Sequence, residues 1–155
     1  PAQVRGAVQA LADRAGVYVF VSSCNVYANH RTPGAGEEAS LLPPLTGEVM
    51  ESMDTYGQAK VACEQLVQQA FEPDQALIAR VGLIGGPGDI FDRTGYWPLR
   101  FARPSPPCGA VLVPDAPELA TQVIDVRDLA AWLIDAGSRR HGGTGKCRAR
   151  TSAQH

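Results

Sequence analysis

Residues 18–27 read YVFVSSCNVY, an apolar run that ends in two serines. The run at 18–21 contains only β-branched and aromatic residues, which is typical of a strand buried on both faces of a parallel sheet. A second apolar run lies at 76–81, and between the two runs residues 55–71 place apolar side chains at helical spacing. Strand, loop, helix and strand make a βαβ crossover, which is expected to be parallel and right-handed. The sequence therefore predicts an α/β fold.

Further helices are predicted before and after this unit in the sequence. Residues 1–15 carry apolar side chains at helical spacing, and Gly16 is placed to end that helix. Asp125 is expected to cap a helix over 126–136. The long segment 29–54 is rich in Pro, Gly, Glu and Thr, so we expect a loop of the kind that lies over a site.

The size and composition of the chain exclude several classes of protein. Its 155 residues suffice for one domain or part of one. With 45% hydrophobic residues, 19% charged residues and a formal net charge of -2, it fits neither a disordered chain nor a basic nucleic-acid binder. The apolar run at 17–21 is far shorter than the roughly 20 residues that cross a bilayer, and no secretory leader is recognisable. Neither nucleic acid nor membrane is an expected partner.

The cysteines and histidines give no sign of a metal site. The four cysteines lie tens of residues apart, so that no CxxC pair exists, and the three histidines are equally scattered. Each cysteine is expected to be a small buried side chain. Reduced thiols of this kind favour a cytoplasmic location.

Tyr56 and Lys60 are four residues apart on the predicted helix, so their side chains share one face. A free phenol has a pKa of about 10, and a pKa near 7 requires about 4 kcal/mol in favour of the phenolate. A unit charge about 4 Å away contributes roughly that amount at an effective dielectric constant near 20. An isolated pair of this spacing is nevertheless more often a packed tyrosine beside a solvated lysine.

Two serines, Ser22 and Ser23, change that assessment. They follow a predicted parallel strand at its carboxyl end, where open α/β sheets bind their ligands. A loop turn or a helix cap is the alternative role for these serines. Together with Tyr56 and Lys60 they predict a site of hydroxyl, phenol and ammonium groups.

Four segments in this order resemble the extended short-chain dehydrogenase/reductase group, specifically its NAD-dependent epimerase/dehydratase type. The segments are SSCNVY at 22–27, YGQAK at 56–60, RVGLIGGPGD at 80–89 and VIDVRDLA at 123–130. They span most of the chain. The resemblance implies a partial Rossmann-type parallel sheet with helices, together with part of a small substrate-binding region.

The resemblance also implies roles for individual residues. Ser23 would hold the substrate oxygen, Tyr56 would be the general acid or base, and Lys60 would lower the phenol pKa and hold the nicotinamide ribose. The substrate contacts would come from Ser23, Cys24 and Asn25. The expected cofactor is NAD or NADP, and the residues expected to contact it are Ser22, Tyr56, Lys60, Gly82, Leu83 and Ile84. No metal ligand is implied.

The reaction class is only partly defined by these residues. Family members that dehydrate nucleotide sugars carry an Asp-Glu pair where this chain has Cys24 and Asn25, so dehydration is not expected. Oxidation or reduction of an alcohol or carbonyl group of a small substrate, for example a sugar-like one, remains, as does epimerisation through a transient ketone. Family members commonly dimerise through the YxxxK helix and the helix before the serine strand, so the full-length protein is expected to be a homodimer.

By resemblance, residues 1–90 are the C-terminal half of an NAD(P)-binding domain, and 91–145 form part of a substrate-binding region and a returning βα unit. The family begins with a GxxGxxG turn that holds the cofactor pyrophosphate, and nothing in this chain is expected to supply that turn. The first half of the fold is thus expected to be absent. Residues 146–155 are predicted to be irregular and are hypothesised to be out of frame.

Three functions therefore remain open from the sequence. The chain is part of a nicotinamide-dependent oxidoreductase or epimerase, or a truncated and inactive remnant of one. The third alternative is a binding module that uses the same scaffold without catalysis, because a fold does not determine a function.

Overall fold

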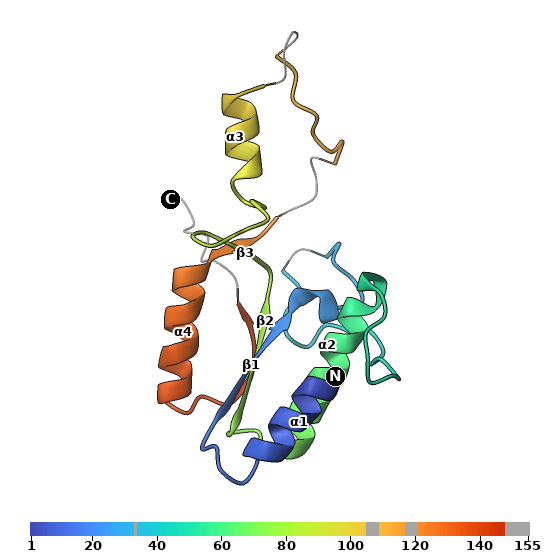
Figure 1. Cartoon of the computed structure of the whole chain (residues 1–155), viewed down its shortest axis with the longest axis vertical. Helices are drawn as coiled ribbons and strands as arrows, with labels where there is room; N and C mark the ends of the chain where they lie inside the picture. The colour runs from blue at the N-terminus through green and yellow to red at the C-terminus, as the bar shows by residue number, and fades with distance from the viewer. Residues whose placement is uncertain (33, 105–108, 117–120, 148–155) are drawn as a thin grey trace.

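A computed structural model describes residues 1–32, 34–104, 109–116 and 121–147 (Figure 1). Its central element is a parallel sheet of three strands, β1 (Tyr18–Ser23), β2 (Ala76–Val81) and β5 (Gly143–Cys147), in the order β1-β2-β5. All residues of β2 are buried, because it lies between the other two strands. The α/β class and the parallel crossover from β1 to β2 are as predicted.

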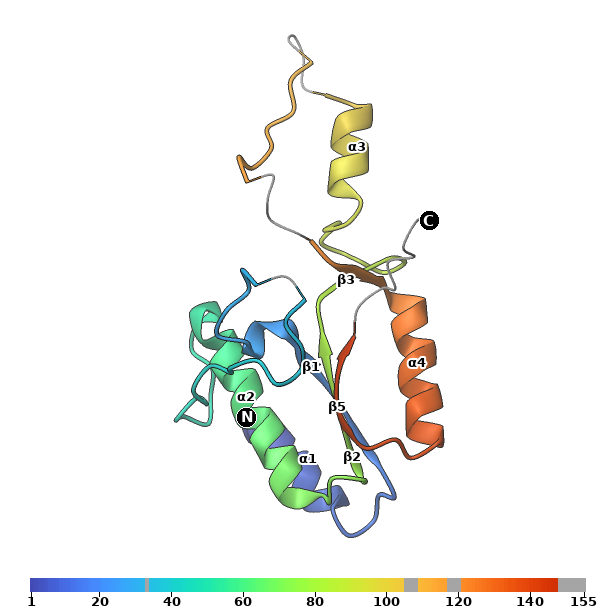
Figure 2. The ribbon, with the colours of Figure 1, turned by 180° about the vertical axis from the view of Figure 1, so that it is seen from behind.

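Helices cover both faces of this sheet. α1 (Ala2–Leu11) and α2 (Tyr56–Ala70) lie side by side on one face, and α4 (Val126–Ser138) lies on the other (Figures 1 and 2). The core between the sheet and the α1–α2 layer consists of apolar side chains from α1, β1, α2 with the residue that follows it, and β2: Val8, Phe20, Cys63, Val67, Phe71, Ala76 and Ile78. A smaller cluster under α4 contains Ala79, Val81, Ile124 and Leu129.

Beyond the carboxyl end of the main sheet, a small second sheet joins β3 (Leu83–Gly85) to β4 (Val123–Asp125) in parallel. β4 runs directly into α4, whose N-cap Asp125 accepts a hydrogen bond from the backbone of Arg127, as the sequence predicted for this cap. A third helix, α3 (Tyr96–Ala102), extends away from both sheets (Figure 1). Two short 3-10 turns complete the chain, η1 (Cys24–Val26) and η2 (Met53–Thr55).

One edge of β1 carries no strand within the described part of the chain. The backbone N–H of Tyr18 donates to Gln75 at the start of β2, and successive residues of a parallel strand direct their backbone groups to alternate sides. The carbonyl groups of Val19 and Val21 therefore point toward the open edge. Val21 is 39% exposed, so β1 is not buried on both faces as its composition suggested.

Several predicted boundaries differ from the structure, among them the end of α4, which is Ser138 rather than residue 136. α1 ends at Leu11 rather than at residue 15, and a turn leads from there to Gly16. β1 continues through both serines of 22–23, because they pair in register with Arg80 and Val81. β5 includes the first two residues of the tail 146–155 that was predicted to be irregular, because this segment pairs with β2. The remainder of that tail lies outside the described residues.

Among the described residues, no helix is both long and apolar enough to cross a membrane, and no group of histidine, cysteine and acidic side chains could hold a metal ion.

Candidate active site

The site lies where β1 and β2 end together. Because the two strands are parallel and Ser23 is in register with Val81, both carboxyl ends reach the same edge of the sheet. The chain then turns sharply: the backbone N–H of Asn25 donates to the Ser23 hydroxyl at 3.1 Å, which caps the 3-10 turn η1. Ser23 is thereby held at the tip of the strand.

The first turn of α2 lies directly against this strand tip. Ser52 caps η2 through the backbone N–H of Asp54, and η2 leads into α2 at Tyr56. The second residue of α2 is Gly57, and a Cβ atom at this position would overlap the backbone oxygen of Asn25. The absence of a side chain therefore lets the helix approach η1 closely, which brings Tyr56 to the end of β1.

Lys60 follows Tyr56 by one helical turn and reaches across to the sheet. Its ammonium nitrogen donates to the backbone oxygen of Val21 at 2.9 Å, on the open edge of β1. The same nitrogen lies 5.0 Å from the centre of the Phe20 ring and 5.9 Å from the centre of the Tyr56 ring. Burial lowers the pKa of Lys60 below its usual value, although the nearby Cys63 and Glu64 side chains oppose this effect.

These elements enclose a cleft of about 540 Å³. The cleft is lined by eight residues that the sequence had singled out: Ser22, Ser23, Asn25, Tyr56, Lys60, Gly82, Leu83 and Ile84. Four residues that were not predicted for the site complete the lining: Val21, Met53, Val81 and Arg93. The strand tip, the phenol, the ammonium group and the chain after β2 thus share one volume of a size typical for small-ligand sites.

Cys24 is the predicted site residue that does not line this cleft. Its thiol instead donates a hydrogen bond to the backbone oxygen of Arg80, at 3.4 Å between sulfur and oxygen. The residue therefore ties η1 to the end of β2 and holds the strand tip from behind.

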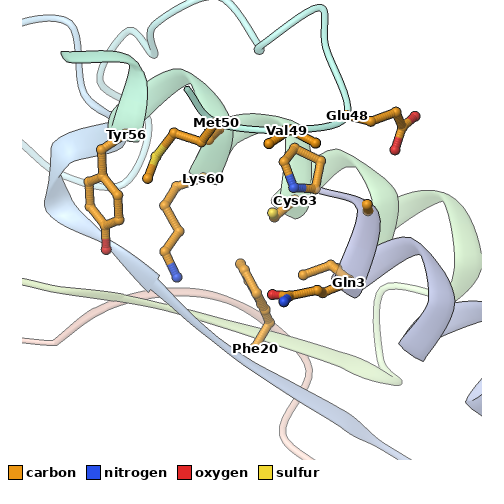
Figure 3. Close-up of a pocket in the computed structure, with 12 residues that line it drawn as sticks. Gln3, Phe20, Glu48, Val49, Met50, Tyr56, Lys60 and Cys63 are labelled. Atoms are coloured by element: carbon orange, nitrogen blue, oxygen red, sulfur yellow. The ribbon is translucent and has the colours of Figure 1, made fainter. Parts of the chain in front are cut away.

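Tyr56 and Lys60 also border a second cavity of about 430 Å³ on the α1 side of the helix (Figure 3). Figure 3 shows the two side chains lying next to each other, with Met50 beside them and Phe20 below. The remaining lining is mostly apolar and includes Cys63 and the first residues of α1. The phenol and the ammonium group therefore lie between two cavities.

A buried ionic network behind the cleft was missed by the sequence analysis. Arg80 of β2 holds the carboxylate of Glu64 from α2, with Nη2 to Oε2 at 2.7 Å, and both side chains are almost completely buried. Arg80 also donates to the Tyr27 hydroxyl and to the backbone oxygen of Glu37. Ser22 donates its hydroxyl proton to Oε1 of Glu64 at 2.5 Å. Burial opposes protonation of Arg80, but its hydrogen bonds to Glu64 and Tyr27 outweigh it and raise the Arg80 pKa.

The sequence did contain a signal for this network. Arg80 interrupts an otherwise apolar strand, and Glu64 lies one turn after Lys60 on the face of α2 that meets the sheet. Charged side chains are rarely buried unless they are paired, so these two positions pointed to each other.

The glycines at 82, 85 and 88 do have the literal GxxGxxG spacing, although no segment of the chain was expected to supply such a turn. The structure places the short strand β3 within this segment, and the next helix, α3, starts only at Tyr96. A pyrophosphate site needs the glycine turn to lead directly into a helix N-terminus, so this segment does not supply one.

Comparison with solved structures found proteins with the same arrangement of elements. A protein from Burkholderia cenocepacia J2315 named as an epimerase superposes with a TM-score of 0.73 at 20% identity, covering 96% of this chain and 46% of its own. A dTDP-4-dehydrorhamnose reductase from Yersinia enterocolitica gives 0.67 at 21% identity, with coverage of 96% and 47%. A UDP-N-acetylglucosamine 4-epimerase from Bacillus cereus gives 0.60 at 18% identity, with coverage of 94% and 48%.

No protein-family model matches the sequence, and the comparison with curated proteins gave no significant match. The chain spans about half the length of each of the solved chains. It therefore has the Rossmann-type fold found in these epimerase and reductase structures, which is the fold class that the sequence predicted.

Proposed function

We propose that the chain carries the catalytic side chains of an NAD(P)-dependent oxidoreductase or epimerase that acts on the carbonyl or alcohol group of a small molecule. The observation that carries the proposal is the shared cleft, in which a strand-tip serine, a helix-borne phenol and a partly buried ammonium group face one volume. The similarity in fold to proteins named as epimerases and as a reductase supports the same reaction class.

The residues in the cleft fit the nicotinamide end of such a cofactor. Lys60 would hold the ribose from the open edge of β1, where Val21 already anchors its ammonium group. Gly82, Leu83 and Ile84 would lie beside the ring, and Ser22 would contact it from the strand side. When bound, a nicotinamide ring accepts a hydride from a carbon atom or returns one to it.

The remaining steps belong to side chains of this chain. Ser23 has its oxygen engaged by the backbone N–H of Asn25, so its own proton is available for a substrate oxygen. Tyr56 would give a proton to that oxygen during reduction and take it back during oxidation, which is general acid–base catalysis. The positive charge of Lys60 would stabilise the phenolate form of Tyr56.

The first experiment is a titration of the chain with NAD and with NADP, in which isothermal calorimetry measures the binding. Saturation in the micromolar range supports the proposal, whereas an absence of binding favours the inactive remnant or the non-catalytic binding module. The solved chains are about twice as long, so the same titration also applies to any longer protein that contains these residues.

The second experiment separates catalysis from binding. Tyr56→Phe should retain the cofactor affinity and lose hydride transfer to a panel of ketones and alcohols, including nucleotide sugars. The matched control is Tyr18→Phe, which removes a hydroxyl at the end of β1 opposite the cleft, keeps the ring stacked on Phe71 and should change neither quantity. Unchanged turnover in Tyr56→Phe would rule out the assigned role of the phenol.

A further inference from the structure

The two neighbouring serines at the strand tip have opposite hydrogen-bonding states. Ser22 donates to the Glu64 carboxylate, and a carboxylate can only accept, so the single hydroxyl proton of Ser22 is committed to that bond. Ser23 accepts from the backbone N–H of Asn25, so its proton is not committed there. Both residues line the cleft.

Glu64 is held in its position by Arg80. The guanidinium group donates from Nε and Nη2 to both carboxylate oxygens, at distances of 2.7 to 3.2 Å. Arginine has donors and no acceptor, so Arg80 fixes the acceptor character of the group that it faces. The Tyr27 hydroxyl and the backbone oxygen of Glu37 hold the other side of the guanidinium group.

We propose that Glu64, oriented by Arg80, makes the Ser22 hydroxyl a hydrogen-bond acceptor toward the cleft, so that this position selects a ligand bearing an N–H donor such as a primary carboxamide. Ser23, one residue further, presents a donor to a ligand oxygen. Glu64 is in this sense a positioning residue that acts through Ser22. The choice of a carboxamide rests on the function proposed above.

A Glu64→Gln variant should reverse the direction of the hydrogen bond between residue 64 and the Ser22 hydroxyl. Arg80 requires an acceptor, so the amide oxygen of the new side chain would face Arg80 and its NH₂ group would face Ser22. The Ser22 hydroxyl would then accept from that NH₂ group, and its own proton would be released toward the cleft. Ser22→Ala removes the hydroxyl altogether and provides a second variant, in which the ion pair is kept.

The first test needs no ligand. In proton NMR spectra of the chain, the Ser22 hydroxyl should give a slowly exchanging signal shifted downfield, because it lies in a short bond to a carboxylate and the residue is only 4% exposed. The signal should vanish in Ser22→Ala and move upfield in Glu64→Gln. Absence of the signal from the wild type, or an unchanged signal in Glu64→Gln, would overturn the inference.

The second test compares NAD with its 3-acetylpyridine analogue, in which a methyl ketone replaces the carboxamide. The wild type should bind NAD about five- to tenfold more tightly, the effect of about one hydrogen bond. This ratio should fall toward one in Ser22→Ala and in Glu64→Gln. The control Glu72→Gln, an exposed residue after the end of α2, should keep the wild-type ratio.

The outcomes distinguish this inference from the proposed function. If both dinucleotides bind and neither variant changes their ratio, the polarity of Ser22 does not select the ligand, and the proposed function stands. If the wild type binds neither dinucleotide, the proposed function and the carboxamide assignment both fail. The NMR measurement then decides the polarity of the two serines by itself.

Discussion

The ammonium nitrogen of Lys60 lies 5.9 Å from the centre of the Tyr56 ring, one helical turn away on α2. Its hydrogen bond to the sheet goes to Val21 rather than to a side chain. The lysine thus connects the helix to the open edge of β1, and its charge stays beside the phenol. This arrangement has a cost, because burial disfavours the charged form of the amine.

The lowered pKa of Lys60 predicts a particular dependence of stability on pH. Between the folded pKa and the unfolded value of about 10.4, the unfolded chain binds more protons, so stability should rise with pH in that window. Urea unfolding should show the wild type gaining stability relative to Lys60→Gln as the pH increases toward that upper limit. Other titrating groups cancel in this comparison. A difference that stays flat or declines would contradict the burial of the Lys60 amine.

Gly57→Ala should destabilise the chain even though alanine is the better helix former. In an open helix interior the substitution gains up to about 1 kcal/mol, but here the new Cβ atom would overlap the backbone oxygen of Asn25, which cannot move freely. Gly6→Ala is the matched control, because Gly6 lies in α1 with open space around it, and it should stabilise by about 0.5–1 kcal/mol. Denaturant midpoints of both variants measure the effect. Equal midpoints would show that α2 can move away from η1.

The cap of α4 should lose its effect in acid. Hydrogen bonds from the side chain and backbone of Arg127 lower the pKa of Asp125 to about 2, below the unfolded value of about 3.9. The stabilisation is therefore fully present above the unfolded pKa and is lost as the pH falls through the folded one. Asp125→Asn keeps an effective cap, so its thermal midpoint should vary less than that of the wild type between pH 5 and pH 3. Asp125→Ala should be the least stable of the three at neutral pH, and identical pH profiles for wild type and Asp125→Asn would exclude the ion pair.

The parts of the fold that local sequence determines were predicted well. β2 matches its predicted range of Ala76–Val81 because every residue of it is buried and Gly82 ends the apolar run. β5 was not foreseen, since Gly143–Cys147 has little strand preference of its own and is extended because β2 offers it a partner. Such pairing depends on a strand more than sixty residues away in the chain, which no local pattern reveals.

In the candidate site, too, the features set by local sequence could be predicted and those set by distant residues could not. Ser23, Tyr56 and Lys60 could be selected from spacing and from their position at the ends of elements, and the structure brings them to one cleft. Their roles in catalysis stay a prediction. Arg93 could not be selected, because it reaches the cleft from a turn beyond β3 that has no periodic pattern. The orientation of the Ser22 O–H bond could not be predicted either, because it depends on Glu64 and Arg80 from two other elements.

The buried pair of Glu64 and Arg80 should give strongly non-additive changes in stability. Arg80→Met would leave the Glu64 carboxylate buried without its ionic partner, which typically costs about 3–5 kcal/mol of stability. Glu64→Leu would leave the Arg80 guanidinium group buried without its ionic partner, at a similar cost. The double variant buries no charge, so it should recover a large part of that loss and lie above the sum of the single effects. Urea unfolding of all four proteins measures the coupling. Additive losses would mean that water reaches the pair, and the fixed orientation of Ser22 would then lose its physical basis, because a solvated carboxylate does not need to take the proton of a neighbouring hydroxyl.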